Sequence, residues 1–204
     1  MPFELQLHCR CGHVRGVAVE VAPQSGFRFV CYCKHCQGFA RFLGRPDVLD
    51  AVGGTDIFQM PGGRVKLTAG MGAIRSLSFS GKVLRWYTDC CRTPIGNTAA
   101  SAGFPVVAII HSFMSVRVGE RSTDEVLGLP LCRIHEKSAI GPLPPDAPPA
   151  ASFRVSGYRT SKLLGWWMKG LGRPNPFFDG KTGAPLSSPR RLTASERAAL
   201  DNAV

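Results

Sequence analysis

The sequence predicts a mainly β fold of short strands, followed by a helical extension at the C-terminus. Short apolar segments recur through residues 5–110, and turns that contain glycine or proline separate many of them. Several segments alternate between apolar and polar residues, which favours strands because successive side chains point to opposite faces of a sheet. After a proline-rich stretch the apolar residues instead crowd together as they do along a helix.

The predicted strands follow one another closely in the first half of the chain. They are residues 5–7, 14–21, 27–30, 57–60, 65–67, 74–79, 83–87 and 105–110. Residues 23–26 form a predicted turn, and residues 80–82 a predicted hairpin connection between two strands. The segment 105–110 is apolar throughout, so we expect a buried strand there.

The C-terminal part has a different character. Residues 122–127 predict a single helical turn, and residues 141–149 contain five prolines in nine positions, which leaves little room for regular structure. Apolar residues between Ser161 and Gly172 predict a helix, and Thr193 with Glu196 predicts the start of a last helix. We therefore expect a zinc-binding β domain in residues 1–140 and a linker with a helical extension, packed on it, in residues 141–204.

The composition describes a basic globular chain. The 204 residues include 25 Lys and Arg against 14 Asp and Glu, a formal net charge of +11. The basic residues are spread along the chain without a block of like charges, which is typical of a solvated surface but also suits nucleic acid, anionic membrane or acidic ligands. No apolar run reaches the ~20 residues that a membrane crossing needs, and no signal peptide is visible, so we expect a cytoplasmic protein.

The cysteines carry the strongest functional signal. Seven of the eight lie in three clusters, whereas Cys132 stands alone and is expected to be a buried core residue. In a reducing cytoplasm such clusters indicate metal ligands rather than disulfides. Seven thiols exceed the needs of one tetrahedral ion, so the sequence predicts two zinc sites.

The first predicted site is open. Cys31 and Cys33 share a face if the preceding strand continues, and a turn would bring Cys36 to meet them. Three converging thiolates suit Zn²⁺ and leave its fourth position for water or substrate.

The second predicted site is closed and structural. Cys9, Cys11, Cys90 and Cys91 lie at strand ends, and a single ion would join them and contribute to folding. Adjacent residues on a strand point to opposite faces, so Cys90 and Cys91 can share an ion only if the chain turns sharply.

Together and in order, the three clusters resemble the glutathione-dependent formaldehyde-activating enzyme family, which includes the centromere protein V type. The resemblance rests on a C-x-C-G motif at 9–12, a C-x-C-x-x-C motif at 31–36 and a segment at 85–95 that follows the pattern R-x-F-C-x-x-C-G-T-P-L. Two departures mark a divergent branch: Thr88 stands where the family has a cysteine, and Arg92 where it has a glycine.

The resemblance implies a β-tent fold of short antiparallel strands, with a structural zinc ion and a second zinc ion linked to catalysis. Cys9, Cys11 and Cys91 become structural ligands, and Cys31, Cys33 and Cys36 become ligands at the active site.

Two classes of function follow from this sequence. One is a carbon–sulfur lyase of the S-(hydroxymethyl)glutathione synthase type, which acts on the adduct of an aldehyde with glutathione or another acidic thiol. Lys34, Arg41 and Arg92 lie near the clusters in the sequence and are the predicted substrate-binding residues. The other is a non-catalytic, zinc-stabilised module that binds protein or, less favoured, nucleic acid. We expect the segment 163–171, which includes Trp166 and Trp167, to form a helix that covers the domain itself; a homodimer interface is the next alternative, and contact with a membrane surface the last.

Overall fold

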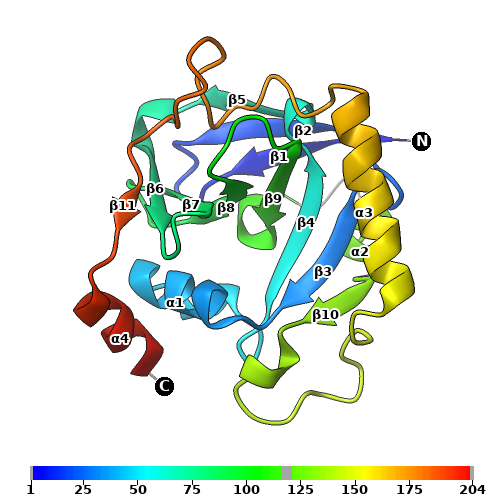
Figure 1. Ribbon diagram of the computed structural model, residues 1–204, viewed down its shortest axis with the longest axis vertical. Coiled ribbons are helices and arrows are strands. Elements are labelled where there is room, and N and C mark those ends of the chain that lie inside the picture. The colour runs from blue at the N-terminus through cyan, green and yellow to red at the C-terminus, as the bar shows by residue number, and fades with distance from the viewer. Residues whose placement is uncertain (1, 116–120, 203–204) are drawn as a thin grey trace.

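Two β-sheets dominate a computed structural model of the protein, which describes residues 2–115 and 121–202 (Figure 1). One sheet has three antiparallel strands in the order β1-β2-β5, and the other has eight strands in the order β10-β3-β4-β9-β8-β7-β6-β11. The strands are β1 (Phe3–His8), β2 (Arg15–Val21), β3 (Phe27–Cys31), β4 (Thr55–Pro61), β5 (Val65–Ala69), β6 (Ile74–Ser78), β7 (Val83–Thr88), β8 (Pro94–Ala99), β9 (Val106–Ile110), β10 (Cys132–Ile134) and β11 (Arg190–Arg191).

Helices lie beside the large sheet, and three of them contribute residues to the core on one of its faces (Figure 1). The α-helices are α1 (Lys34–Leu43), α2 (Thr123–Leu127), α3 (Phe153–Met168) and α4 (Ala194–Asn202). Short 3₁₀ turns cover Pro46–Val48, Gly62–Arg64, Met71–Ala73, His111–Phe113 and Glu136–Ser138. None of the described helices has the length and apolar character that a bilayer crossing needs.

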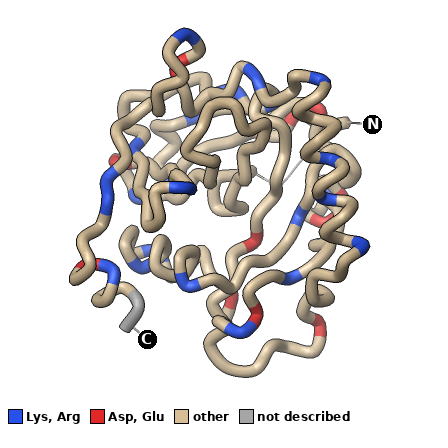
Figure 2. The backbone as a smooth tube through the Cα atoms, in the orientation of Figure 1, with Lys and Arg blue, Asp and Glu red and all other residues tan. Residues whose placement is uncertain are grey.

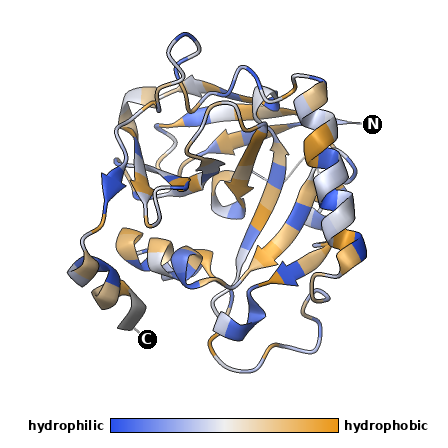
Figure 3. Cartoon of the chain, in the orientation of Figure 1, coloured by the Kyte–Doolittle hydropathy of each residue, from blue (hydrophilic) through white to orange (hydrophobic). Residues whose placement is uncertain are grey.

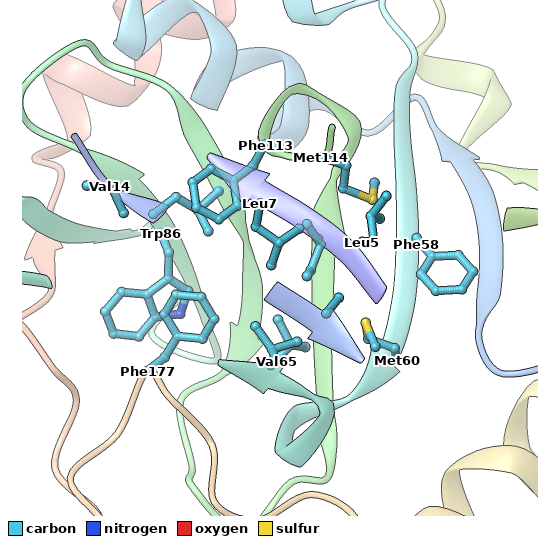
Figure 4. Packing of buried hydrophobic residues seen from close by; sticks show 14 of the residues in the cluster. Leu5, Leu7, Val14, Phe58, Met60, Val65, Trp86, Phe113, Met114 and Phe177 are labelled. Atoms are coloured by element: carbon cyan, nitrogen blue, oxygen red, sulfur yellow. The ribbon is translucent and has the colours of Figure 1, made fainter. Parts of the chain in front are cut away.

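The first hydrophobic core fills the space between the two sheets (Figure 4). Leu5 and Leu7 of β1 pack there with Phe58 and Met60 of β4. Trp86 of β7 is fully buried in the same core and donates a hydrogen bond from its indole nitrogen to Thr98 (2.9 Å). β3 and β4 are mostly apolar with polar residues among them (Figure 3), and both strands are buried over almost their whole length.

The second core lies on the opposite face of the large sheet. Phe27 and Phe29 of β3 pack there with Phe39 of α1 and Tyr87 of β7. The register β3–β4–β9–β8–β7 aligns alternate residues of all five strands on this face. The face therefore carries α1 at one side and α3 at the other, with the middle strands between them.

The strand predictions agree well with the structure, and the expectation of a mainly β fold is correct in part. The fold is mixed α/β with mostly strands, and the large sheet is not wholly antiparallel, because β10 pairs parallel to β3 and β11 parallel to β6. Both strands belong to the C-terminal half of the chain and reach the sheet edges through long connections, which permits parallel pairing.

Several elements lie outside the sequence-based predictions. β8 contains Gly96 and Asn97, which disfavour strands, yet Gly96 is needed because a Cβ there would lie 2.5 Å from the Ala108 carbonyl oxygen. The sequence pattern predicts no helix for the short segment that forms α1. α3 begins at Phe153, well before Ser161, because the Ser152 hydroxyl caps it by accepting a hydrogen bond from the Val155 amide (3.2 Å).

Candidate metal centres

The first cluster joins two distant parts of the chain through Cys9, Cys11, Cys90 and Cys91. All four sulfur atoms lie within 4.8 Å of one another. The sulfur–sulfur separations are 3.5 Å for Cys9–Cys11, 3.4 Å for Cys11–Cys90, and 3.9 Å for both Cys9–Cys90 and Cys90–Cys91. All four thiols are free, and these separations far exceed the ~2.05 Å of a disulfide.

A sharp turn after β7 allows the adjacent Cys90 and Cys91 to face one centre. The Thr88 amide donates to the Thr93 carbonyl (3.0 Å), and the Arg92 amide donates to the Thr88 carbonyl (2.9 Å), which closes the loop. Arg92 has φ 57°, a left-handed conformation that a glycine would adopt more easily. Because the chain turns here, the side chains of Cys90 and Cys91 can face the same centre, which they could not do on an extended strand.

The surroundings of this cluster favour negative charge on one sulfur. Burial opposes ionisation of Cys91, but hydrogen bonds with Thr88 (3.4 Å) and Thr93 (3.2 Å) lower its pKa to about 5. Burial and a hydrogen bond with Cys11 raise the pKa of Cys90 to about 12. The pKa values of Cys90 and Cys91 thus move in opposite directions, and a bound divalent ion would favour the thiolate form of its ligands.

The second cluster forms where β3 passes into α1. Cys31 is the last residue of β3, Cys33 is the N-cap of α1, and Cys36 lies in its first turn. Their sulfur atoms lie within 4.8 Å of one another. The Cys33 sulfur accepts a hydrogen bond from the Cys36 amide (3.4 Å). The positive end of the α1 dipole favours thiolates at this position.

A buried arginine, Arg85 of β7, contacts the three-cysteine cluster. Its Nη1 donates to the Cys36 sulfur (3.5 Å) and to Asn97 Oδ1 (3.2 Å). The guanidinium carbon lies 5.8 Å from the ring centre of Phe39 and 5.6 Å from that of Phe79. The guanidinium of Arg85 therefore lies between two aromatic rings and donates a hydrogen bond to the Cys36 sulfur.

The three thiols differ strongly in acidity. Hydrogen bonds from Cys31 and Cys33, with the nearby Arg85 charge, hold the pKa of Cys36 well below its usual range despite burial. Hydrogen bonds to Cys33 and Cys36, together with burial, raise the pKa of Cys31. The charge of Arg85 therefore favours the thiolate form of Cys36 over that of Cys31.

Both donor sets fit zinc by their chemistry. Four sulfurs around a tetrahedral ion with Zn–S bonds of about 2.3 Å lie about 3.8 Å apart, close to the separations in the four-cysteine cluster. Thiolate ligands favour soft or borderline ions such as Zn²⁺. The two clusters can therefore hold two metal ions, one with four protein ligands and one with three.

The three predicted substrate-binding residues differ in their surroundings and contacts. Arg41 donates from Nη1 to the carbonyl of Leu200 in α4 (2.7 Å), so its charge serves the contact between two helices. Arg92 is exposed and places its guanidinium over the ring of Phe42 (5.6 Å). Lys34 is exposed at the start of α1, beside Cys33.

Sequence reasoning missed Arg85 as part of a site. It lies within the 85–95 motif, but nothing in the local pattern distinguished it from the other basic residues. A charged residue inside an otherwise apolar strand segment is the one signal that pointed to a buried role. Its contact with Cys36 joins residues 49 positions apart, which only the sheet order brings together. Cys132 is buried outside both clusters, as expected.

The fold and the clusters define a class of protein: a mixed α/β chain with two cysteine clusters that can each hold a metal ion. The chain belongs to the family of unknown function DUF6151, which matches residues 1–188. The matched region includes all seven clustered cysteines and extends through α3. A comparison with curated proteins found no match. The comparisons show no link to the glutathione-dependent formaldehyde-activating family.

Proposed function

We propose that the protein is a two-zinc carbon–sulfur lyase in which the two cysteine clusters have different tasks. Cys9, Cys11, Cys90 and Cys91 hold a structural ion that joins the N-terminal hairpin to the loop after β7. Cys31, Cys33 and Cys36 hold a second ion at a site that accepts a thiol and an aldehyde. The likeness of the cysteine motifs to the glutathione-dependent formaldehyde-activating family, with its β-tent fold, supports this proposal.

The single observation that carries the proposal is the contact of Arg85 with Cys36. A closed structural site with four protein ligands leaves no coordination position for substrate, whereas a site with three protein ligands keeps one open. The three-cysteine cluster has only three protein ligands among the described residues, and it has a guanidinium 3.5 Å from one sulfur. Three thiolates around Zn²⁺ carry a formal charge of −1, which Arg85 offsets.

The reaction that fits this site is the reversible addition of a thiol to an aldehyde. Zinc, when bound, supplies a modest Lewis acid for a thiolate or a carbonyl oxygen. The substrate sulfur bonds to the carbonyl carbon, the π electrons move to oxygen, and the thiol proton ends on that oxygen as a hydroxyl. Arg85, whose guanidinium also donates to Asn97, holds the Cys36 sulfur, and the dipole of α1 stabilises negative charge beside it.

Metal content per chain, measured on protein purified without chelator, tests the two-site arrangement. We expect about two zinc ions in the parent and one fewer in Cys33→Ser, with the fold retained. Cys132→Ala is the matched control, since it removes a buried thiol outside both clusters and should keep two ions. One ion in the parent, unchanged in Cys33→Ser, would contradict the proposal and favour a zinc-stabilised binding module.

The activity requires a separate test. Exchange of formaldehyde with glutathione, followed by NMR, should accelerate with the parent and return to the uncatalysed rate with Cys33→Ser. A parent that contains two zinc ions yet leaves the exchange rate unchanged would overturn the lyase proposal while keeping the zinc sites.

A further inference from the structure

A small pocket lies between α3 and the edge of the large sheet formed by β3 and β10. Its volume is about 130 Å³. Its lining is largely apolar, with polar groups added by α3: Phe27, Phe29, Cys132, Ile134, Ala151, Val155, Ser156, Arg159 and Thr160. An engineered apolar cavity of about 150 Å³ holds a benzene molecule. The pocket therefore has room for a ring or a branched chain of similar size.

Helix α3 carries a basic residue, Arg159, in the middle of the face that packs on the sheet. Val155, Arg159 and Trp166 follow at helical spacing, and α3 runs along β3 and β10 (Figure 1). Phe27 contacts the ring of Tyr158 on the same helix (6.4 Å). A position expected to be apolar thus carries a half-buried guanidinium.

Arg159 has no acidic partner within the described part of the chain. Its Nε donates to Gln59 Oε1 of β4 (2.8 Å), and the described residues offer its other nitrogens no hydrogen-bond acceptor. Some other buried or partly buried arginines pair with carboxylates, as Arg28 does with Asp56 (2.7 Å) and Arg133 with Glu136 (2.6 Å). Lys and Arg are spread along the chain (Figure 2), and Arg159 is the basic residue among those that line the pocket.

The Cys132 thiol does not serve as the missing anion. Burial raises the pKa of Cys132 and lowers that of Arg159. Both effects follow from a poorly solvated site that holds a cation without a counter-charge. A ligand carboxylate would supply that charge and accept hydrogen bonds from the two free nitrogens of the guanidinium.

We propose that this pocket binds a small monocarboxylate with an apolar body about the size of a phenyl ring. The apolar body occupies the space between Phe27, Phe29 and Val155, and the carboxylate pairs with Arg159 at the helix side. The site is separate from both cysteine clusters, and the inference does not depend on the proposed lyase function.

Benzoate is the probe, and backbone amide NMR shifts of the zinc-loaded full chain are the readout. We expect saturable shifts at Phe27, Phe29 and Val155. Benzamide, which has the same shape without the charge, should bind about tenfold or more weakly. Arg159→Gln should lose affinity for benzoate by about tenfold or more, whereas Arg154→Gln, an exposed arginine on the same helix, should bind as the parent does.

Two results would overturn the proposal. Equal affinity for benzoate and benzamide would show that no charge is recognised, and unchanged benzoate binding by Arg159→Gln would show that Arg159 is not the partner. If Arg159→Gln fails to fold, Val155→Phe provides the test, because it fills the pocket and keeps the guanidinium. Benzoate binding should then be lost, and binding that persists in Val155→Phe would refute the site.

Discussion

Replacing Arg85 with glutamine should weaken zinc binding at the three-cysteine cluster. The guanidinium lies 3.5 Å from the Cys36 sulfur, where a unit-charge attraction at an effective dielectric constant of 20 is at most about 5 kcal/mol. Burial of the cation opposes this attraction, so a net value of about 1.5–3 kcal/mol, typical of a hydrogen bond to a charged group, is the better guide. Zinc affinity at this cluster should therefore fall by about 10–100-fold.

A chelator competition titration at constant pH measures this effect. The four-cysteine cluster serves as an internal reference, because Arg85 has no contact with its residues among those described. Arg154→Gln provides the matched control, since it removes an exposed arginine on α3. The thermal midpoint and the near-ultraviolet circular dichroism show whether Arg85→Gln keeps its fold after losing the contacts with Phe39 and Phe79. A folded variant with unchanged affinity at the three-cysteine cluster would refute the reasoning.

Two further predictions concern stability. Cys90→Ser removes one sulfur from the four-cysteine cluster, so zinc content should fall by one ion and the thermal midpoint should drop, with little further loss on adding chelator; a variant that keeps both ions would exclude Cys90 as a ligand. Phe177→Ala should cost about 3–5 kcal/mol in unfolding free energy, because Phe177 is fully buried and its ring stacks on Trp86 at 5.0 Å. Urea unfolding checks this, and a cost below about 1 kcal/mol would show that the C-terminal chain contributes little to the core between the sheets.

The sequence by itself determined the features that depend on local patterns. Short apolar segments, some of them alternating with polar residues and bounded by turns, located most strands, and the spacing of the cysteines indicated both clusters. Thr193 and Glu196 form the expected capping box at α4, with the Glu196 amide donating to the Thr193 hydroxyl (3.2 Å) and the Thr193 amide to Glu196 (2.8 Å). These signals are local because they follow from the repeat of a strand or helix and from hydrogen bonds within one turn.

Only the tertiary structure decided which residues complete the sites. Cys90 joins its cluster because the loop after β7 curls back on itself, and Arg85 reaches Cys36 because β7 lies beneath α1. Arg159 donates a hydrogen bond to Gln59, 100 positions earlier in the sequence, and lines the pocket between α3 and the sheet. The sequence contains many basic residues that look alike by local pattern. The register of distant strands decides which of them, such as Arg85, are buried against other groups and which remain solvated.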